Sequence, residues 1–330
     1  DIFDQYIGNL LSSNSDAVRE ATAEAISRLN YGNAAERLNR LANDNSLSAK
    51  LRASAVEALY AIDADEVDAA VAMAIKTKSP LLRAAAVRVL AKRNAKSEEL
   101  FPALTEALNG RDIREQQNAI DVLGSLKSKE AIALLEIQTQ QLIKGATSSF
   151  LQLDILEAAK ANKGGKLSQM TFDYEESRAE RALADRFPEL LNGGDAMVGE
   201  SIFRTSYTAQ CIRCHKLGQV GGDVGPSLSG VASRLDGRAL LESLIDPQAK
   251  IADGYGLTTF TMKNGETFTG SIEKKSANFF SIKDQSGARF LIKTADIKSS
   301  SKSVSSMPPM MGILAPRDLR DLVAYMKTLK

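Results

Sequence analysis

The sequence predicts a mainly α-helical protein of two domains. An α-solenoid over residues 1–192 precedes a smaller domain over residues 193–330, which carries a small antiparallel β insertion at about 257–297. Three observations predict this fold class. One helical motif recurs at a nearly constant interval, a charge difference separates the two parts, and alternating apolar residues surround hairpin turn signals in the second part. At 330 residues the chain also exceeds the usual size of a single domain.

The N-terminal part repeats one helical motif at intervals of 33, 31, 33 and 35 residues. The segments are "TAEAISRL" (22–29), "AVEALYAI" (55–62), "AVRVLAKR" (86–93), "AIDVLGSL" (119–126) and "DILEAAKA" (154–161). A further helix and a short breaker such as "TKSP" or "NGRD" lie between consecutive segments. Because a two-helix unit cannot bury its apolar face alone, we expect neighbouring units to stack. The pattern resembles HEAT-type repeats over roughly residues 10–160; a globular helical bundle is the alternative.

Charge distinguishes the two predicted domains. From Asp195 to Lys330 there are 18 Lys and Arg residues against 13 Asp and Glu residues, a net charge of +5, and the remainder carries −4. The glycine-containing stretch "NGGD" (192–195) marks the boundary. Just before it, "YEESRAERALADRF" (174–187) is predicted to be a charged helix that closes the array.

The composition gives no indication of a nucleic-acid or membrane partner. The net charge of the whole chain is +1, with 44% hydrophobic and 25% charged residues. No apolar run reaches the roughly 18 residues that a membrane span requires, so we expect no transmembrane segment.

Two hairpins are predicted within the second domain. The stretch 257–272 alternates around Asn264-Gly265, which is a strong turn signal, and 278–293 does so around Ser286-Gly287. The even-numbered positions form the apolar face: Phe260, Met262, Phe268, Ile272, Phe280, Ile282, Phe290 and Ile292. A small antiparallel sheet is therefore expected between a helix at 237–246 and the methionine-rich stretch that begins near residue 305.

The cysteine and histidine residues of the chain all lie within five positions. Cys211, Cys214 and His215 form a Cys-x-x-Cys-His motif, and the sequence has no other cysteine or histidine. This motif is the signature of covalent haem c attachment, in which two thiols add to the vinyl groups of one porphyrin and the imidazole binds the iron. A redox dithiol and a zinc site completed by a carboxylate are the alternatives.

The segment after the motif is expected to orient the histidine. The glycine loop "GQVGGDVGP" is expected to let the backbone approach the flat haem edge closely. Pro226, eleven residues after His215, is placed for its carbonyl to accept the ring N–H of the imidazole. A plain surface loop and a plain turn are the alternatives for these two features.

A methionine is the expected second axial ligand, because the chain has no second histidine. Met307 lies in "SSMPPMMGIL", where two prolines stiffen the loop, and Met310 is the alternative. Met326 on the last helix is assigned to apolar packing.

Arg234, Tyr255 and Arg213 are candidate partners for haem propionates, since a guanidinium or a phenol can satisfy a carboxylate beside a buried ring. A solvated surface position is the alternative for each.

From about Asp195 onward the chain resembles the C-terminal haem-binding domain of large planctomycete- and verrucomicrobial-type proteins. The motifs that carry the resemblance are "GESIF", "CIRCHK", "GGDVGPSLSGVASR", "LLESLIDPQAKIADGYG", "SSMP" and "LRDLVAYMKTLK". The resemblance implies a class I-like cytochrome c domain with Cys211 and Cys214 as thioether links, His215 as the proximal ligand and Met307 as the distal ligand. HEAT-like repeats often precede this domain in the family, and a sugar-dehydrogenase-like β-propeller commonly precedes both.

These observations lead us to expect an electron-transfer module with one covalent haem and His/Met ligation of its iron. The expected partners are redox proteins, an upstream dehydrogenase and a downstream cytochrome or oxidase, and the expected location is periplasmic or exported. Because the repeats begin near Asp1, we expect a fragment or a stand-alone relative in which no dehydrogenase site is visible. The alternative is a repeat scaffold whose haem senses a ligand or has an open-site, peroxidase-like activity.

Overall fold

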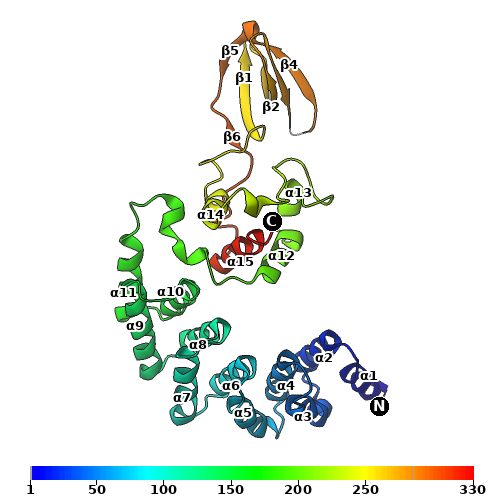
Figure 1. The fold of residues 1–330 in the computed structure, drawn as a ribbon, viewed down its shortest axis with the longest axis vertical. Helices are drawn as coiled ribbons and strands as arrows, with labels where there is room; N and C mark the ends of the chain where they lie inside the picture. The colour runs from blue at the N-terminus through cyan, green and yellow to red at the C-terminus, as the bar shows by residue number, and fades with distance from the viewer. Residues whose placement is uncertain (1, 285) are drawn as a thin grey trace. The chain divides into compact units, whose positions relative to one another are not determined.

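The computed structural model describes residues 2–284 and 286–330, which are mainly helical with a small antiparallel sheet toward the C-terminus (Figure 1). The chain divides into two compact units. The first contains the chain up to Thr147 together with Asp154–Asp173, and the second contains Ser148–Leu153 together with Tyr174–Lys330. Among the described residues, no helix combines the length and the apolar character needed to cross a bilayer.

The first unit is an array of helices joined by short turns. Its elements are α1 (Ile2–Leu11), α2 (Asp16–Leu29), η1 (Gly32–Ala34), α3 (Ala35–Asn43), α4 (Ala49–Ala61), α5 (Val67–Ile75), α6 (Pro80–Lys92), α7 (Ser97–Leu108), α8 (Ile113–Ser125), α9 (Lys129–Ile143), α10 (Gln152–Ala161) and α11 (Gly165–Glu176). The recurring motif lies on alternate helices, α2, α4, α6, α8 and α10, and consecutive members from α2 to α8 pack against each other. These stacked pairs agree with a HEAT-type solenoid.

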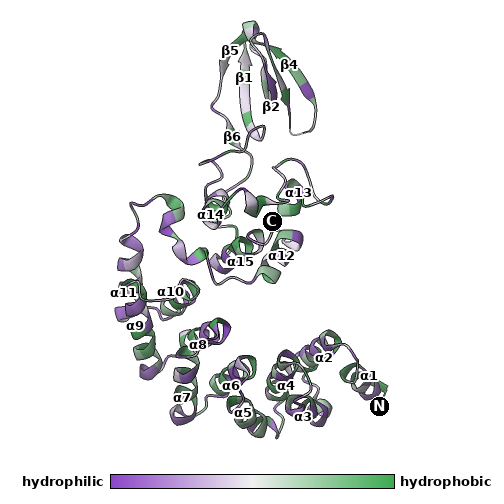
Figure 2. Ribbon diagram, viewed as in Figure 1, coloured by the Kyte–Doolittle hydropathy of each residue, from purple (hydrophilic) through white to green (hydrophobic). Residues whose placement is uncertain are grey.

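The same two motif positions form the core in every repeat. The second and fifth residues of each segment are at most 4% exposed: Ala23, Val56, Val87, Ile120 and Ile155 at the second position, and Ile26, Leu59, Leu90, Leu123 and Ala158 at the fifth. Because they lie three apart on a helix, they share one face. The helices accordingly carry both hydrophobic and hydrophilic residues (Figure 2).

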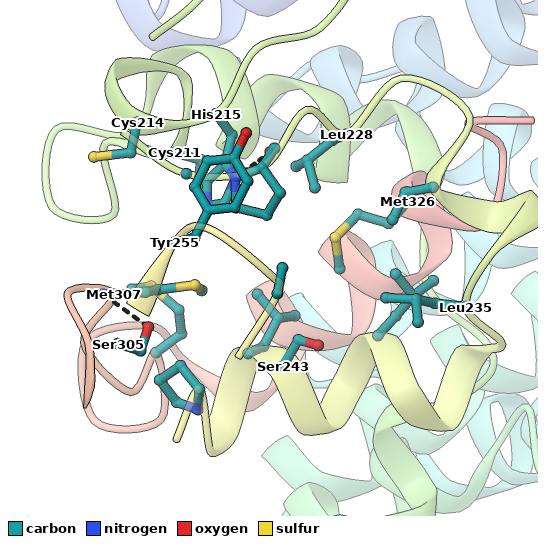
Figure 3. A pocket seen from close by; sticks show the side chains of 18 of the residues that line it. Cys211, Cys214, His215, Leu228, Leu235, Ser243, Tyr255, Ser305, Met307 and Met326 are labelled. Atoms are coloured by element: carbon teal, nitrogen blue, oxygen red, sulfur yellow. Dashed lines mark hydrogen bonds between the residues drawn. The ribbon is translucent and has the colours of Figure 1, made fainter. Parts of the chain in front are cut away.

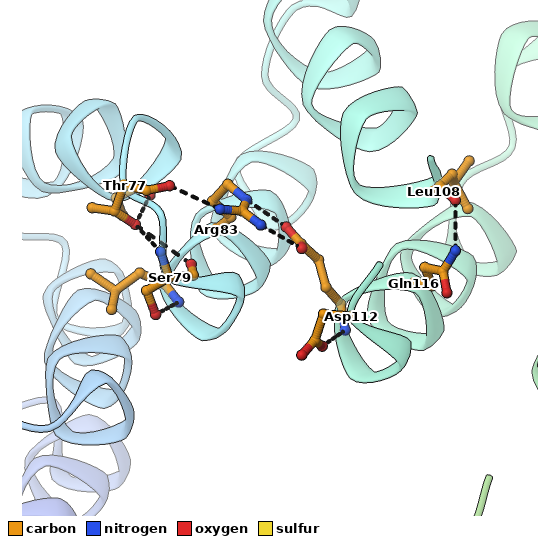
Figure 4. Close-up of polar contacts among 9 residues, drawn as sticks. Thr77, Ser79, Arg83, Leu108, Asp112 and Gln116 are labelled. Carbon is orange, nitrogen blue, oxygen red and sulfur yellow. Dashed lines mark hydrogen bonds and ion pairs between the residues drawn. The ribbon is translucent and has the colours of Figure 1, made fainter. Parts of the chain in front are cut away.

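In three of the repeats, a polar side chain three residues before the motif fixes the turn that precedes the motif helix. In these three successive repeats this side chain donates to a backbone carbonyl at or just beyond the end of the preceding helix, with distances of 3.0 Å for Arg52 to Ala42, 2.9 Å for Arg83 to Thr77 and 2.9 Å for Gln116 to Leu108. The last two contacts are drawn in Figure 4. Since the last carbonyls of a helix have no partner within it, the contacts to Ala42 and Leu108 satisfy such carbonyls from the next helix, and the contact to Thr77 holds the turn after α5.

Arg83 also joins two repeats through a buried ion pair. Its Nε and Nη2 lie 2.7 and 2.6 Å from the two carboxylate oxygens of Glu115 on α8. Glu115 is only 2% exposed, and its backbone N–H donates to the N-cap residue Asp112. A carboxylate removed from water in this way depends on its partner guanidinium.

The predicted charged helix over residues 174–187 is wrong. Helix α11 ends at Glu176, and turns lead to the short helices η2 (Leu183–Arg186) and η3 (Pro188–Leu190). Pro188 disfavours helical geometry at Phe187, whose φ and ψ are −126° and 53°. The guanidinium of Arg178 lies 2.7 Å from Glu189, and both side chains are buried. This segment therefore packs in the second unit rather than extending the repeats.

The helical part of the second unit centres on two crossing helices. Its remaining elements are α12 (Ala196–Thr205), α13 (Cys211–Cys214), η4 (Val231–Ser233), α14 (Gly237–Ile245) and α15 (Pro316–Met326). At the crossing of α12 and α15, a Cβ on Gly199 would lie 2.0 Å from the backbone oxygen of Asp321. One turn further, the rings of Phe203 and Tyr325 are 5.9 Å apart. The two helix backbones therefore touch at a position where only glycine fits.

The β insertion forms a six-stranded sheet. Its elements are β1 (Gly256–Met262), β2 (Thr267–Lys275), β3 (Phe279–Lys283), β4 (Arg289–Lys293), η5 (Thr294–Asp296), β5 (Ile297–Ser300) and β6 (Val304–Ser305). The order is β4-β3-β2-β1-β5, and β6 also pairs with β1. Both predicted hairpins are confirmed, with Thr261 opposite Thr267 and Lys283 opposite Arg289. The predicted apolar positions form the core of the sheet, whereas β5 and β6 were not predicted.

We expect Arg83→Met to lower the free energy of unfolding of the repeat unit by about 3 kcal/mol, because it leaves the buried Glu115 carboxylate without its partner. Chemical denaturation followed by far-UV circular dichroism measures this loss. Arg111→Met is the control, since Arg111 is exposed and should change stability by less than about 0.5 kcal/mol. Equal effects of the two variants would contradict the assignment of a structural ion pair.

Candidate functional site

The second unit contains a largely apolar cavity of about 400 Å³, which is within the range of small-molecule and cofactor sites. Four segments contribute most of its walls: the stretch from Ala209 to Pro226, the loop and helix around Leu228–Ser243, the stretch 244–255, and the methionine segment Ser305–Met310; Phe203 of α12 and Leu322 and Met326 of α15 complete them. Figure 3 shows Cys211, Cys214 and His215 at one side of this space and Met307 at another. Most residues selected from the sequence therefore meet at one cavity.

The two cysteines lie on a single helical turn. Helix α13 begins after Gln210, which has left-handed backbone geometry, and the His215 N–H donates to the Cys211 carbonyl at 2.9 Å. Both thiols are free, and both residues line the cavity. Burial raises the pKa of the Cys211 thiol above its usual range. A redox dithiol needs the opposite shift, so this environment gives no support to that alternative.

His215 is held by the backbone segment that follows it. Its Nδ1 lies 2.8 Å from the carbonyl oxygen of Pro226, which is the hydrogen bond expected from the sequence. Since a carbonyl only accepts, Nδ1 carries the proton and Nε2 keeps its lone pair. Burial lowers the pKa of the imidazole, against the opposing effect of the Pro226 hydrogen bond. The ring is therefore held neutral, in the tautomer that leaves Nε2 available to a metal.

Gly225 packs directly against the imidazole. A Cβ at this position would lie 2.5 Å from Cε1 and 2.8 Å from Nδ1 of His215. The Gly225 N–H also donates to the Cys214 carbonyl at 2.8 Å, which ties the glycine loop to helix α13. The glycine backbone thus lies directly against the histidine ring, whereas its expected approach to a haem edge stays a prediction.

Arg234 fixes the segment beyond Pro226. Its Nη2 donates to the carbonyl of Ser227 at 2.9 Å and its Nη1 to that of Ser229 at 3.0 Å. Arg234 lines the cavity, as does Tyr255. Arg213 is not among the lining residues: it is exposed, and its Nη1 donates to Gln210 at 2.5 Å. On a one-turn helix the two cysteines share a face, which directs the residue between them away.

Three methionines line the cavity. Met307 is half-buried and its N–H donates to the Ser305 hydroxyl at 3.2 Å (Figure 3). Met310 is 3% exposed and belongs to the core, and its N–H donates to the Leu244 carbonyl at 2.8 Å. Met326 packs in the core as the sequence indicated, but it also lines the cavity.

Several residues near the site were not selected from the sequence. Glu242, Asp246 and Lys250, on and after α14, also line the cavity. Within the described ranges 2–284 and 286–330, no three His, Cys, Asp or Glu side chains lie close enough together to hold a metal ion directly. These three residues belong to the motif "LLESLIDPQAKIADGYG", which is among those that carry the family resemblance. The sequence alone gave no indication of which charged residues of this motif face the cavity.

Comparison with protein families matches residues 67–141 to HEAT repeats. These residues run from α5 into α9, so the match covers the central repeats of the first unit. A comparison with curated proteins gives no match.

We expect Gly225→Ala to raise the pKa of His215 toward its ordinary value in the haem-free chain. The added methyl group displaces the ring, which then regains contact with water, and burial is the cause of the lowered pKa. An NMR titration follows this group directly, because the chain has one histidine. Gln219→Ala, in the exposed part of the same loop, should leave the titration unchanged, and an unchanged pKa in Gly225→Ala would contradict the packing described above.

Proposed function

We propose that the second unit is a class I-like cytochrome c domain that binds one haem c covalently and transfers electrons. Cys211 and Cys214 would form the thioether links, and His215 and Met307 would be the axial ligands of the iron. The observation that carries this proposal is that one apolar cavity is lined by both thiols, the imidazole and a methionine from a segment 92 residues later. The Cys-x-x-Cys-His spacing supports the same cofactor.

The residues present fit a covalently bound haem. The neutral imidazole has an unshared Nε2 lone pair, as axial ligation requires. Because Gly225 has no Cβ, the backbone can pack against the imidazole while the ring keeps its hydrogen bond to Pro226. The absence of a direct three-ligand cluster among the described residues is compatible with this cofactor, because the porphyrin itself supplies four of the six iron ligands.

Bound haem supplies a one-electron Fe(III)/Fe(II) couple. The protein's contribution is to hold the ligands and to exclude water. Val231, Leu240 and Leu322 are buried and line the cavity, so its interior is of low polarity. Arg234 lies at the same cavity with guanidinium donors that remain after its two carbonyl bonds, and these suit a propionate. Tyr255 is a second candidate partner for a propionate.

The proposed partners are redox proteins, a dehydrogenase as donor and a cytochrome or oxidase as acceptor. The part from Asp195 onward carries +5 and the remainder −4, which suits weak, salt-sensitive docking of charged partners. The stacked repeats would present an extended surface for one of them. Haem attachment through this motif takes place outside the bacterial cytoplasm, so a periplasmic or exported location belongs to the proposal.

Covalent attachment is the first test. After expression with the haem maturation system, the intact mass should exceed that of the polypeptide by one haem, and acid–acetone extraction should leave the colour with the protein. Cys211→Ala/Cys214→Ala should lose the colour to the solvent. A wild-type chain that releases all its haem, or that binds zinc instead, would refute the proposal.

Met307→Ala tests the distal ligand. It should abolish the sulfur-to-iron charge-transfer band in the visible spectrum and lower the reduction potential, because a thioether ligand raises the potential of haem iron. Met310→Ala is the matched variant and should keep the band, although its buried position makes it destabilising. Loss of the band in Met310→Ala alone would assign the ligand to Met310. Rapid binding of carbon monoxide by the wild-type chain would instead favour an open-site sensor or peroxidase.

A further inference from the structure

The methionine segment is fixed at its far end by the protein core. The Met310 N–H donates to the carbonyl of Leu244 in α14 at 2.8 Å, and both residues belong to the same buried cluster. The two prolines at positions 308 and 309 restrict the backbone between Met307 and Met310. This end is therefore held by backbone bonding and apolar burial together.

The near end of the segment is held on one side by the pairing of β6 with β1, and on its other side by one side chain. The carboxamide of Gln248 makes two hydrogen bonds to the backbone of Ser305: its Oε1 accepts the Ser305 N–H at 2.9 Å, and its Nε2 donates to the Ser305 carbonyl at 3.1 Å. The Gln248 carboxamide thus makes the two backbone hydrogen bonds to Ser305 that a neighbouring strand would otherwise make. Ser305 in turn accepts the Met307 N–H through its hydroxyl at 3.2 Å.

Gln248 is itself held close to the cavity wall. Pro247, the residue before it, is buried and lines the cavity, and the Gln248 N–H donates to the Asp246 carboxylate at 3.2 Å. A series of hydrogen bonds thus connects the cavity wall at the end of α14 to Met307, first from Gln248 to Ser305 and then from Ser305 to Met307.

From this geometry we infer that Gln248 is a positioning residue, which holds Ser305 so that the sulfur of Met307 is presented to the cavity. The inference rests on the proposed function in taking Met307 as the distal ligand. Only an amide fits both bonds, because a carboxylate accepts the Ser305 N–H but has no proton for the Ser305 carbonyl.

The first measurement uses the haem-free full-length chain. In Gln248→Ala, amide hydrogen exchange at Ser305 should rise about tenfold, as expected for the loss of one hydrogen bond that protects it. In Gln248→Glu the Ser305 N–H should stay protected, since an acceptor remains. Gln169→Ala is the control: Gln169 is an exposed glutamine of the first unit that donates to Asp173 at 2.7 Å. Unchanged exchange in Gln248→Ala would overturn the inference.

The second measurement uses the haem-loaded chain and separates positioning from simple structural support. Gln248→Ala should weaken the charge-transfer band, lower the potential and raise the rate of cyanide binding about tenfold, while Gln169→Ala should match the wild type. Faster exchange with an unchanged band, potential and cyanide rate would overturn the positioning role. A wild-type chain without covalent haem would refute the proposed function, and the exchange at Ser305 would then alone decide whether Gln248 holds the segment.

Discussion

The contact between α12 and α15 at Gly199 is the constraint on which the second unit depends. The backbones of the two helices meet there, and the Asp321 carboxylate accepts the N–H of Asp195 at 2.8 Å just before α12 begins. Burial raises the pKa of the Asp321 carboxyl, and this hydrogen bond opposes the rise. Helix α12 leads into the Cys-x-x-Cys-His turn and α15 follows the methionine segment, so the crossing brings the first and last walls of the cavity together.

The two sides of the cavity are stabilised in different ways. Around His215 the chain is tied by backbone hydrogen bonds between the glycine loop and the α13 turn, at 3.0 Å from Gly222 to Ile212 and 2.8 Å from Gly225 to Cys214. The methionine side has fewer backbone bonds of its own and depends on α14 and on an exposed glutamine. Segments with few buried contacts and exposed hydrogen bonds open at lower free energy. If haem binds as proposed, loss of the Met307 ligand would therefore be an easier opening of this site than loss of His215.

The sequence predicted the parts of the structure that local periodicity controls. The repeat interval located α2, α4, α6, α8 and α10, and the alternation of apolar residues located both hairpins with the correct face. The Pro226 carbonyl was also predictable, because its distance along the chain from His215 is short. The helix predicted over 174–187 failed because charge patterning contains no information on the buried Arg178–Glu189 pair that redirects the chain. Gln248 was missed for a similar reason, since its two bonds to Ser305 join positions 57 residues apart.

The β insertion lengthens the chain between the two proposed iron ligands without separating them in space. Strand β6 returns beside the start of β1, with Ser305 opposite Gly256, so the insertion leaves the helical part and re-enters it at adjacent points. The sheet has its own core, in which Phe260 and Ile282 are fully buried. An ion pair of 3.3 Å between Lys283 and Asp223 joins the sheet to the glycine loop, but both groups are at the surface and contribute little to stability. Because the closure is made at residues 256 and 305, immediately before Met307, the register of β6 on β1 also determines where the methionine segment begins. The core of the sheet is thus separate from the cavity. The insertion affects the cavity where it joins the helical part, at residues 256 and 305.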